Sequence, residues 1–215
     1  MTRKLTFAVA TVLLGAAISS ANAVPISPSP TVVSGDLTFS NFSCSSAAGG
    51  LPCSAIDIAA YTSSVPPDPA AGESGIRLTG AFNALAGASN DTTIQYDLHS
   101  SGRLITDASM YFNGTPISSV AEQIYDLVTN ALIGSLFVQN PPADFTDHIN
   151  LTTATTGIRV VKDIQYIGGS GQSTISIIDQ TFSERGTPIP EPASLALLGS
   201  ALLGFGLIWR LRRSA

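Results

Sequence analysis

The sequence has few of the residues that build metal sites and covalent catalytic sites. Of its 215 residues, only two are histidines, His99 and His148, and only two are cysteines, Cys44 and Cys53. Neither type has the His-x-x-x-His or Cys-x-x-Cys spacing of zinc sites, and no Gly-x-Ser-x-Gly elbow marks a nucleophilic serine. We therefore expect no cofactor, no bound metal and no enzymatic activity.

Basic side chains are also scarce away from the two ends of the chain. Residues 24–192 contain five lysines and arginines and all 15 acidic residues, so the formal charge of this part is five minus fifteen, or −10. Phosphate binding needs clustered lysine and arginine. We therefore exclude nucleic acid as a partner, and the charge favours a secreted, self-repelling surface protein.

A long hydrophobic run lies near the C-terminus. Residues 193–209 carry no charge and would span about 25 Å as a helix at about 1.5 Å per residue, which just reaches the length that crosses a bilayer. This pattern predicts one transmembrane helix. The run ends with an aromatic residue suited to the membrane interface, and a basic tail that the positive-inside rule places in the cytoplasm follows it: Trp209, then Arg210, Arg212 and Arg213.

The N-terminus predicts export to the opposite side of the membrane. A basic start is followed by an apolar stretch over residues 5–18 and by the small residues Ala21 and Ala23. This is the pattern of a secretory signal peptide, expected to be helical over residues 1–23. Cleavage after Ala23 would make Val24 the first residue of the mature protein.

The end of the chain resembles a known sorting signal. Pro190, Glu191 and Pro192 precede the apolar run and the arginine cluster, and this order is similar to the PEP-CTERM signal of Gram-negative bacteria. The resemblance implies recognition by an exosortase, a membrane-embedded cysteine transpeptidase-like enzyme. It also implies a transient stay in the inner membrane, transfer to the cell surface or extracellular matrix, and a link to exopolysaccharide and biofilm formation.

Three segments follow from these features. We expect a signal peptide over residues 1–23, an ectodomain over 24–188 and a sorting signal over 189–215. Within the sorting signal, the motif covers residues 190–192, the transmembrane helix 193–209 and the basic tail 210–215. The expected partners are the secretion machinery, the exosortase, the membrane before processing, and exopolysaccharide.

The ectodomain has the short alternating apolar patterns of an all-β domain. In residues 93–98, Ile94, Tyr96 and Leu98 share one face, while Gln95, Asp97 and His99 share the other. We predict an antiparallel β-sandwich with jelly-roll-like character. Its expected strands lie at 37–39, 76–79, 93–98, 104–112, 132–138, 158–166 and 173–178.

Two local predictions concern connections between these strands. Gly168, Gly169 and Gly171 favour a hairpin loop in which glycines supply positive φ angles. Residues 120–129 fit either a strand or a short helix. Cys44 and Cys53 are expected to pair, because an exported protein meets oxidising conditions and the ten-residue loop between them contains two glycines and a proline.

Two groups of carboxylates are candidates for chemistry. Asp144, Asp147 and His148 form the densest polar cluster and could supply calcium ligands, although a solvated loop explains them more simply. Paired carboxylates of a glycoside hydrolase could come from a second group, but cross-strand ion pairing on the outer face is our preferred interpretation of residues 159–163. This second group consists of Asp97, Asp107, Asp126 and Asp163.

Three classes of function are compatible with the sequence. The first is a non-enzymatic envelope or matrix protein sorted by an exosortase, which is our leading hypothesis. The second is a carbohydrate-binding or ice-binding β-sandwich module, which the low aromatic content of 7% disfavours. The third is a secreted hydrolase, for which no site stands out.

Overall fold

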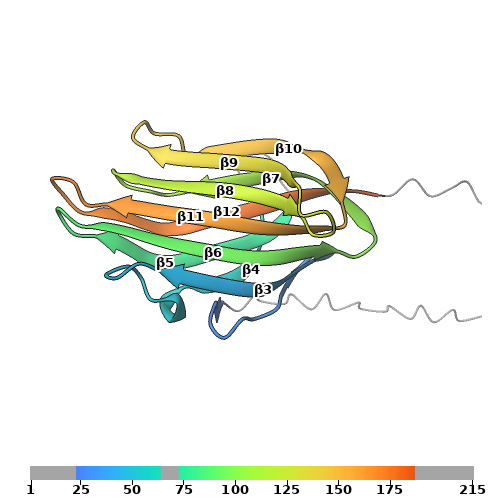
Figure 1. The fold of residues 1–215 in the computed structure, drawn as a ribbon, viewed down its shortest axis with the longest axis horizontal. Helices are drawn as coiled ribbons and strands as arrows, with labels where there is room; N and C mark the ends of the chain where they lie inside the picture. The colour runs from blue at the N-terminus through green and yellow to red at the C-terminus, as the bar shows by residue number, and fades with distance from the viewer. Residues whose placement is uncertain (1–22, 64–72, 187–215) are drawn as a thin grey trace, which may run out of the picture.

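The computed structural model describes residues 23–63 and 73–186. Within these ranges, two six-stranded antiparallel sheets overlie one another as a β-sandwich (Figure 1). This confirms the all-β sandwich. The first sheet contains, in spatial order, β1 (Val24–Pro25), β4 (Asp57–Thr62), β5 (Ser74–Ala84), β12 (Ser173–Gly186), β7 (Arg103–Phe112) and β10 (Thr146–Thr155).

The second sheet faces the first one across the core. Its strands are, in spatial order, β2 (Val32–Ser34), β3 (Leu37–Ser46), β6 (Ser89–Ser100), β11 (Gly157–Ile167), β8 (Ser118–Asp126) and β9 (Leu132–Asn140). A short 3-10 helix, η1 (Cys53–Ala55), precedes β4. From β5 onward the chain changes sheet at every connection except β8 to β9, which makes the order β5-β12-β7-β10 against β6-β11-β8-β9 that of a jelly roll.

The core lies between the inner faces of the two sheets. Ile94, Tyr96 and Leu98 are fully buried, as the alternation in this segment predicts, and His99 on the other face is exposed. Tyr96 packs against Phe39 and Phe42, with ring centroids 5.9 and 5.3 Å apart. Period-two patterning therefore assigns the inner face of β6 correctly.

The predicted hairpin between residues 158–166 and 173–178 is wrong. β11 lies in the second sheet and β12 in the first, so their connection crosses the sandwich edge. Gly168, Gly169 and Gly171 are also not among the described glycines with positive φ. The glycine at 168 serves close packing instead, because an added Cβ there would overlap the backbone carbonyl of Leu85.

The ambiguous segment 120–129 is strand up to Asp126, where β8 ends and the turn to β9 begins. Strands β1, β2, β4 and β10 are not among the strands that the sequence predicts. Within residues 23–63 and 73–186, no helix is long and apolar enough to cross a membrane. The expected signal-peptide helix and transmembrane helix lie outside the described residues.

Candidate functional site

The outer face of the second sheet carries rows of side chains that run across its strands. One row joins Phe137 on β9, Ala121 on β8, Asp163 on β11 and Thr93 on β6, each directly opposite the next. Phe137 is 46% exposed and has only the small Ala121 between it and the Asp163 carboxylate. We name this surface the outer platform. Its central members are Asp91, Gln123, Tyr125, Phe137, Arg159 and Asp163.

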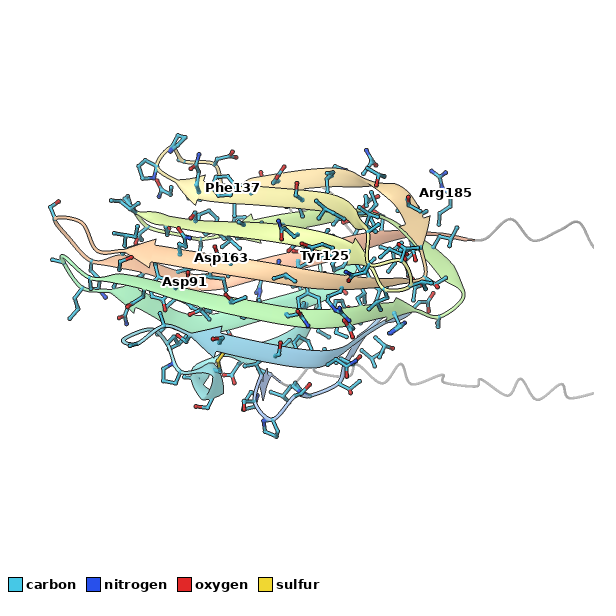
Figure 2. The ribbon with its side chains drawn as sticks, in the orientation of Figure 1. Asp91, Tyr125, Phe137, Asp163 and Arg185 are labelled. Atoms are coloured by element: carbon cyan, nitrogen blue, oxygen red, sulfur yellow. A yellow bond between two sulfur atoms is a disulfide. The ribbon has the colours of Figure 1, made fainter. Side chains whose placement is uncertain are left out.

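The labelled side chains of the outer platform come from four neighbouring strands. Figure 2 shows Phe137 on β9, Tyr125 on β8, Asp163 on β11 and Asp91 on β6. The Tyr125 hydroxyl donates a hydrogen bond to the Gln123 side-chain oxygen at 2.7 Å. An aromatic ring, planar amides and carboxylates on one face of a sheet are groups that can stack on and hydrogen-bond to a polar, ring-shaped ligand.

A charged pair stiffens one side of the outer platform. Arg159 lies directly opposite Asp97, and its Nε is 3.1 Å from the Asp97 Oδ1. A bulge in β3 aims Asn41, at a φ of 54°, toward the same carboxylate, and its Nδ2 donates to Asp97 Oδ2 at 2.9 Å. The predicted cross-strand ion pairing is therefore confirmed for Arg159.

Two like charges lie together on the other side of the platform. Burial raises the pKa of Asp91 above its ordinary value, and the neighbouring Asp163 carboxylate raises it further. Asp163 also accepts a hydrogen bond from the Gln165 amide at 3.1 Å. Ion pairing is thus the wrong interpretation of Asp163, because its carboxylate neighbour has the same sign.

A depression at one end of β8, β9 and β11 continues the outer platform. Ser119, Gln139 and Gln165 line it on the platform side, and the exposed apolar side chains of Ile117 and Ile167 line it on the other. Asn140 contributes here as well, and its amide donates to the Gly114 carbonyl at 2.9 Å. The depression therefore has a polar side next to the outer platform and an apolar side away from it.

The calcium candidates do not converge in the structure. Asp147 and His148 lie in β10 rather than in a loop, and only Asp144 falls in the turn before it. The Asp147 carboxylate accepts the backbone N–H groups of Phe137 and His148, both at 2.8 Å. Within residues 23–63 and 73–186, no group of three or more potential ligands is placed to hold a metal ion.

The four hydrolase candidates are spread over the sandwich. Asp107 lies on the first sheet, where its Oδ1 accepts the Ser183 N–H at 3.1 Å. Asp126 closes the turn after β8 by accepting the N–H groups of Val128 and Thr129 at 3.0 and 2.7 Å. Its pKa is lowered to about 2, first by the Thr129 N–H and then by the side chains of Thr155 and Thr129. Asp97 and Asp163 share the outer platform. The structure thus brings only two of the four to one surface.

The outer face of the first sheet holds a contact that sequence reasoning missed. The Ser109 hydroxyl is 2.9 Å from His148 Nδ1 and 3.5 Å from a Glu73 oxygen. Glu73 also accepts hydrogen bonds from Thr181, at 2.9 Å, and from Ser183. In a catalytic triad the acid orients the histidine, whereas here the acid contacts the serine. This cluster joins strands rather than forming a triad.

The most unusual polar group lies inside the core. Lys162, predicted on the outer face, is fully buried, and its Nζ contacts the Glu122 carboxylate and lies 2.5 Å from Gln180 Oε1. Lys162 follows Ile158 and Val160 at even spacing along β11 and shares their inward direction. Ion pairing on the outer face is therefore the wrong interpretation of this lysine, and strict alternation would have placed it inside.

The cysteine prediction is confirmed. Cys44, near the end of β3, and Cys53, in η1, form a disulfide with 5.9 Å between their Cα atoms. Val24 begins β1 and pairs with Ile58. The other residues of the two targeting signals lie outside the described ranges: Ala21, Pro190, Glu191, Pro192, Trp209, Arg210, Arg212 and Arg213.

Comparison with known families identifies the end of the chain. The model of the PEP-CTERM protein-sorting motif matches residues 188–213. This match confirms that the chain carries a PEP-CTERM sorting motif, whose first matched residue is two positions beyond the end of β12 at Gly186. No curated protein matches the chain.

Several solved structures are similar to the chain in strand arrangement. TmCBM61 in complex with β-1,4-galactotriose has 13% identity over 66% of this chain and 89% of its own, with a TM-score of 0.37. The family 11 carbohydrate-binding module of Clostridium thermocellum has 10% identity over 66% and 88%, with a TM-score of 0.28. The enzymatically active domain of bacteriophage CBA120 tailspike protein 4 has 10% identity over 66% and 19%, with a TM-score of 0.33. At these low scores we carry over neither ligand nor activity.

Proposed function

We propose that this chain is an exported protein of the cell surface or extracellular matrix, sorted by an exosortase through its PEP-CTERM motif, and that its ectodomain is not an enzyme. The observation that carries the proposal is the sorting motif at residues 188–213, which begins almost directly after the last strand of the sandwich. A jelly roll that ends beside a sorting signal is suited to being displayed or released as a single unit.

The hydrogen bonds that several carboxylates already accept within the fold support a non-enzymatic role. Asp97 and Asp107 accept hydrogen bonds at irregularities in β3 and β12, and Asp126 accepts hydrogen bonds that hold a turn. Carboxylates with such structural duties are less available for acid and base chemistry. A secreted hydrolase is accordingly the weakest of the three functional classes.

Fractionation of cells that produce the full chain tests the sorting proposal. The triple variant Pro190→Ala, Glu191→Ala, Pro192→Ala removes the motif and leaves the ectodomain and the apolar run intact. We expect this variant to accumulate in the inner membrane, while the wild type reaches the surface or medium. Glu184→Gln, close to the motif but outside it, is the control. Equal distribution of wild type and triple variant would overturn the proposal.

A second candidate function is binding of the exopolysaccharide itself through the outer platform. It is favoured by the half-exposed Phe137 ring, which lies beside the small Ala121 and the polar Asp163. A sugar ring stacked on Phe137 would place its hydroxyls within reach of planar side chains on β8 and β11. Ice binding is the alternative use of this exposed sheet face.

Binding measurements separate these ligands. We expect the exported protein to co-sediment with its producer's exopolysaccharide, and Phe137→Ala to weaken that binding by about tenfold, which corresponds to about 1.4 kcal/mol. Leu85→Ala changes an exposed side chain in the connection between β5 and β6 and is the matched control. Equal binding by wild type and Phe137→Ala would reject the outer platform as the glycan site, and activity in an ice-recrystallisation assay would favour ice instead.

A further inference from the structure

Three polar side chains from three strands meet inside the sandwich. Lys162 on β11 lies directly opposite Glu122 on β8 in the second sheet, and Gln180 on β12 reaches them from the first sheet. Lys162 and Gln180 are 0% exposed and Glu122 is 1% exposed. The Lys162 Nζ contacts Glu122 Oε2, lies 2.5 Å from Gln180 Oε1 and is 3.5 Å from the Met110 sulfur.

The surroundings of this cluster favour its uncharged form. Burial lowers the pKa of Lys162, although the Glu122 charge acts in the opposite direction. Burial likewise raises the pKa of Glu122. Desolvation is the largest influence on both groups, and it favours a neutral amine beside a carboxylic acid over the ion pair. A neutral lysine amine has a lone pair and is a nucleophile.

Some atoms of the cluster have no partner in the noncovalent arrangement. Among the described residues, Glu122 Oε1, Gln180 Nε2 and the Tyr96 hydroxyl are buried side-chain atoms without a hydrogen bond. Buried polar groups without partners are rare in native proteins and require an explanation. Loss of the Gln180 amide nitrogen in a reaction would remove one of them.

We propose that Lys162 and Gln180 join in an intramolecular isopeptide bond that links the two sheets through the core. The Lys162 Nζ lies against Gln180 Oε1 and therefore next to Cδ, the carbon bonded to that oxygen. The geometry of an amine beside a carboxamide, with a carboxylic acid touching the amine, is that of an amide exchange with an acid–base group in place.

The reaction needs no external reagent. The Nζ lone pair attacks Cδ of Gln180 and forms the new N–C bond. Glu122, which begins as the carboxylic acid, donates its carboxyl proton to Nε2 and accepts a proton from Nζ on its other oxygen, so that the Cδ–Nε2 bond breaks and ammonia leaves. The product is a secondary amide between Lys162 and Gln180, and Glu122 ends protonated as it began. Glu122 is thus the catalytic residue of the step, because it contacts the reacting amine.

The bond would tie together parts of the sandwich that the disulfide does not reach. Cys44 and Cys53 join β3 to η1 near the N-terminal end of the ectodomain, whereas Lys162 and Gln180 join the central strands β11 and β12 of the two sheets. This inference does not depend on the proposed glycan ligand or on exosortase processing, since it concerns the folded ectodomain alone.

Mass spectrometry of the exported protein tests the proposal. After reduction and denaturation, we expect a mass lower by one ammonia than the sequence between the observed termini requires. Proteolysis should release a branched peptide that joins Lys162 to Gln180. The peptide-level result is needed because asparagine can also lose ammonia, as at Asn113 before Gly114. An unmodified Lys162, or a loss of water with Lys162 joined to Glu122, would overturn the proposal.

Two variants test the assigned roles. Glu122→Gln keeps the size of the side chain but removes the proton-transfer group, so we expect a folded protein of full mass. Lys162→Met removes the nucleophile and should also have the full mass. A branched peptide in Glu122→Gln at the wild-type yield would refute the role of Glu122. If either variant fails to fold, the mass of the wild-type protein still decides whether the bond exists.

Discussion

Arg77 on β5 holds Asp179 on β12 through two parallel bonds, Nε to Oδ1 at 2.6 Å and Nη2 to Oδ2 at 2.8 Å. The two residues lie directly opposite one another, and the guanidinium also stacks over the Tyr61 ring, 4.5 Å from its centroid. Asp179 is 3% exposed and Arg77 36%. This pair therefore fastens two neighbouring strands of the first sheet from the outside.

Loss of the Asp179 charge should destabilise the domain. Asp179→Asn keeps the shape but weakens both charge-assisted bonds, so we expect the free energy of unfolding to fall by about 1–3 kcal/mol. Urea denaturation measures this change in the free energy of unfolding. Asp36→Asn is the control. The salt bridge between Asp36 Oδ2 and Arg103 Nε is 3.4 Å long and exposed to solvent, so this substitution should change the free energy of unfolding by less than about 1 kcal/mol. Equal effects of the two substitutions would contradict this account.

The contribution of the turn after β8 to the stability of the protein should depend on pH. The pKa of Asp126 is lowered to about 2 by its hydrogen bonds to Thr129 and neighbouring groups. A lowered folded-state pKa stabilises the protein above the unfolded value of about 3.9, and this benefit disappears as the pH falls toward the folded value. Asp126→Asn should therefore lower the melting temperature at pH 7 and make little difference near pH 2. A difference in melting temperature between the wild type and Asp126→Asn that stays constant with pH would contradict this explanation.

The Asp91–Asp163 pair should change stability with pH in the opposite direction to Asp126. The folded-state pKa of Asp91 is raised, first by burial and then by Asp163, so the two charges cost stability above that pKa and the cost disappears in acid. We expect Asp163→Asn to stabilise the protein by about 0.5 kcal/mol at neutral pH, because it removes a like-charge contact. The gain should vanish below about pH 4. Asp57→Asn, on the first sheet, removes one negative charge elsewhere and should give no such pH-dependent gain.

The disulfide should make a measurable contribution to stability. Cys44 and Cys53 are separated by nine positions and close a short loop. Replacing both with serine should lower the free energy of unfolding by about 2–3 kcal/mol on the loop-entropy model. Adding reductant to the wild-type protein should lower its stability by the same amount. Reductant should not change the stability of the double variant. A reductant effect that persists in the variant would contradict this explanation.

Local alternation of apolar residues is sufficient to assign the inner faces of β6 and β11. Alternation placed Ile94, Tyr96 and Leu98 inside, because a half-buried strand must repeat every two residues. The same rule also places Lys162 inside, between Val160 and Ile164. The outer-face prediction for Lys162 is wrong because it followed the general rarity of fully buried lysines and not the alternation of this strand. Functionally interesting residues are those that break the rule of polar outside and apolar inside.

Other features could not be read from local sequence. Gly168 and Gly169 look like hairpin glycines, but β11 and β12 belong to different sheets, and this depends on pairings with β5, β6, β7 and β8 far away in the chain. The meeting of Ser109, His148 and Glu73 depends in the same way on strand order. The outer platform likewise arises from register across strands, which no single segment contains.

The most direct test of the central claim, that this protein is sorted and processed through its PEP-CTERM motif, is a mass-spectrometric analysis of its C-terminus. The surface or extracellular form would be isolated from matched strains with and without the exosortase. Our account predicts that peptides from residues 193–215 are missing from that form when the exosortase is present, and that the full tail persists in the membrane when it is absent. Retention of residues 193–215 to the same extent in both strains would contradict the account.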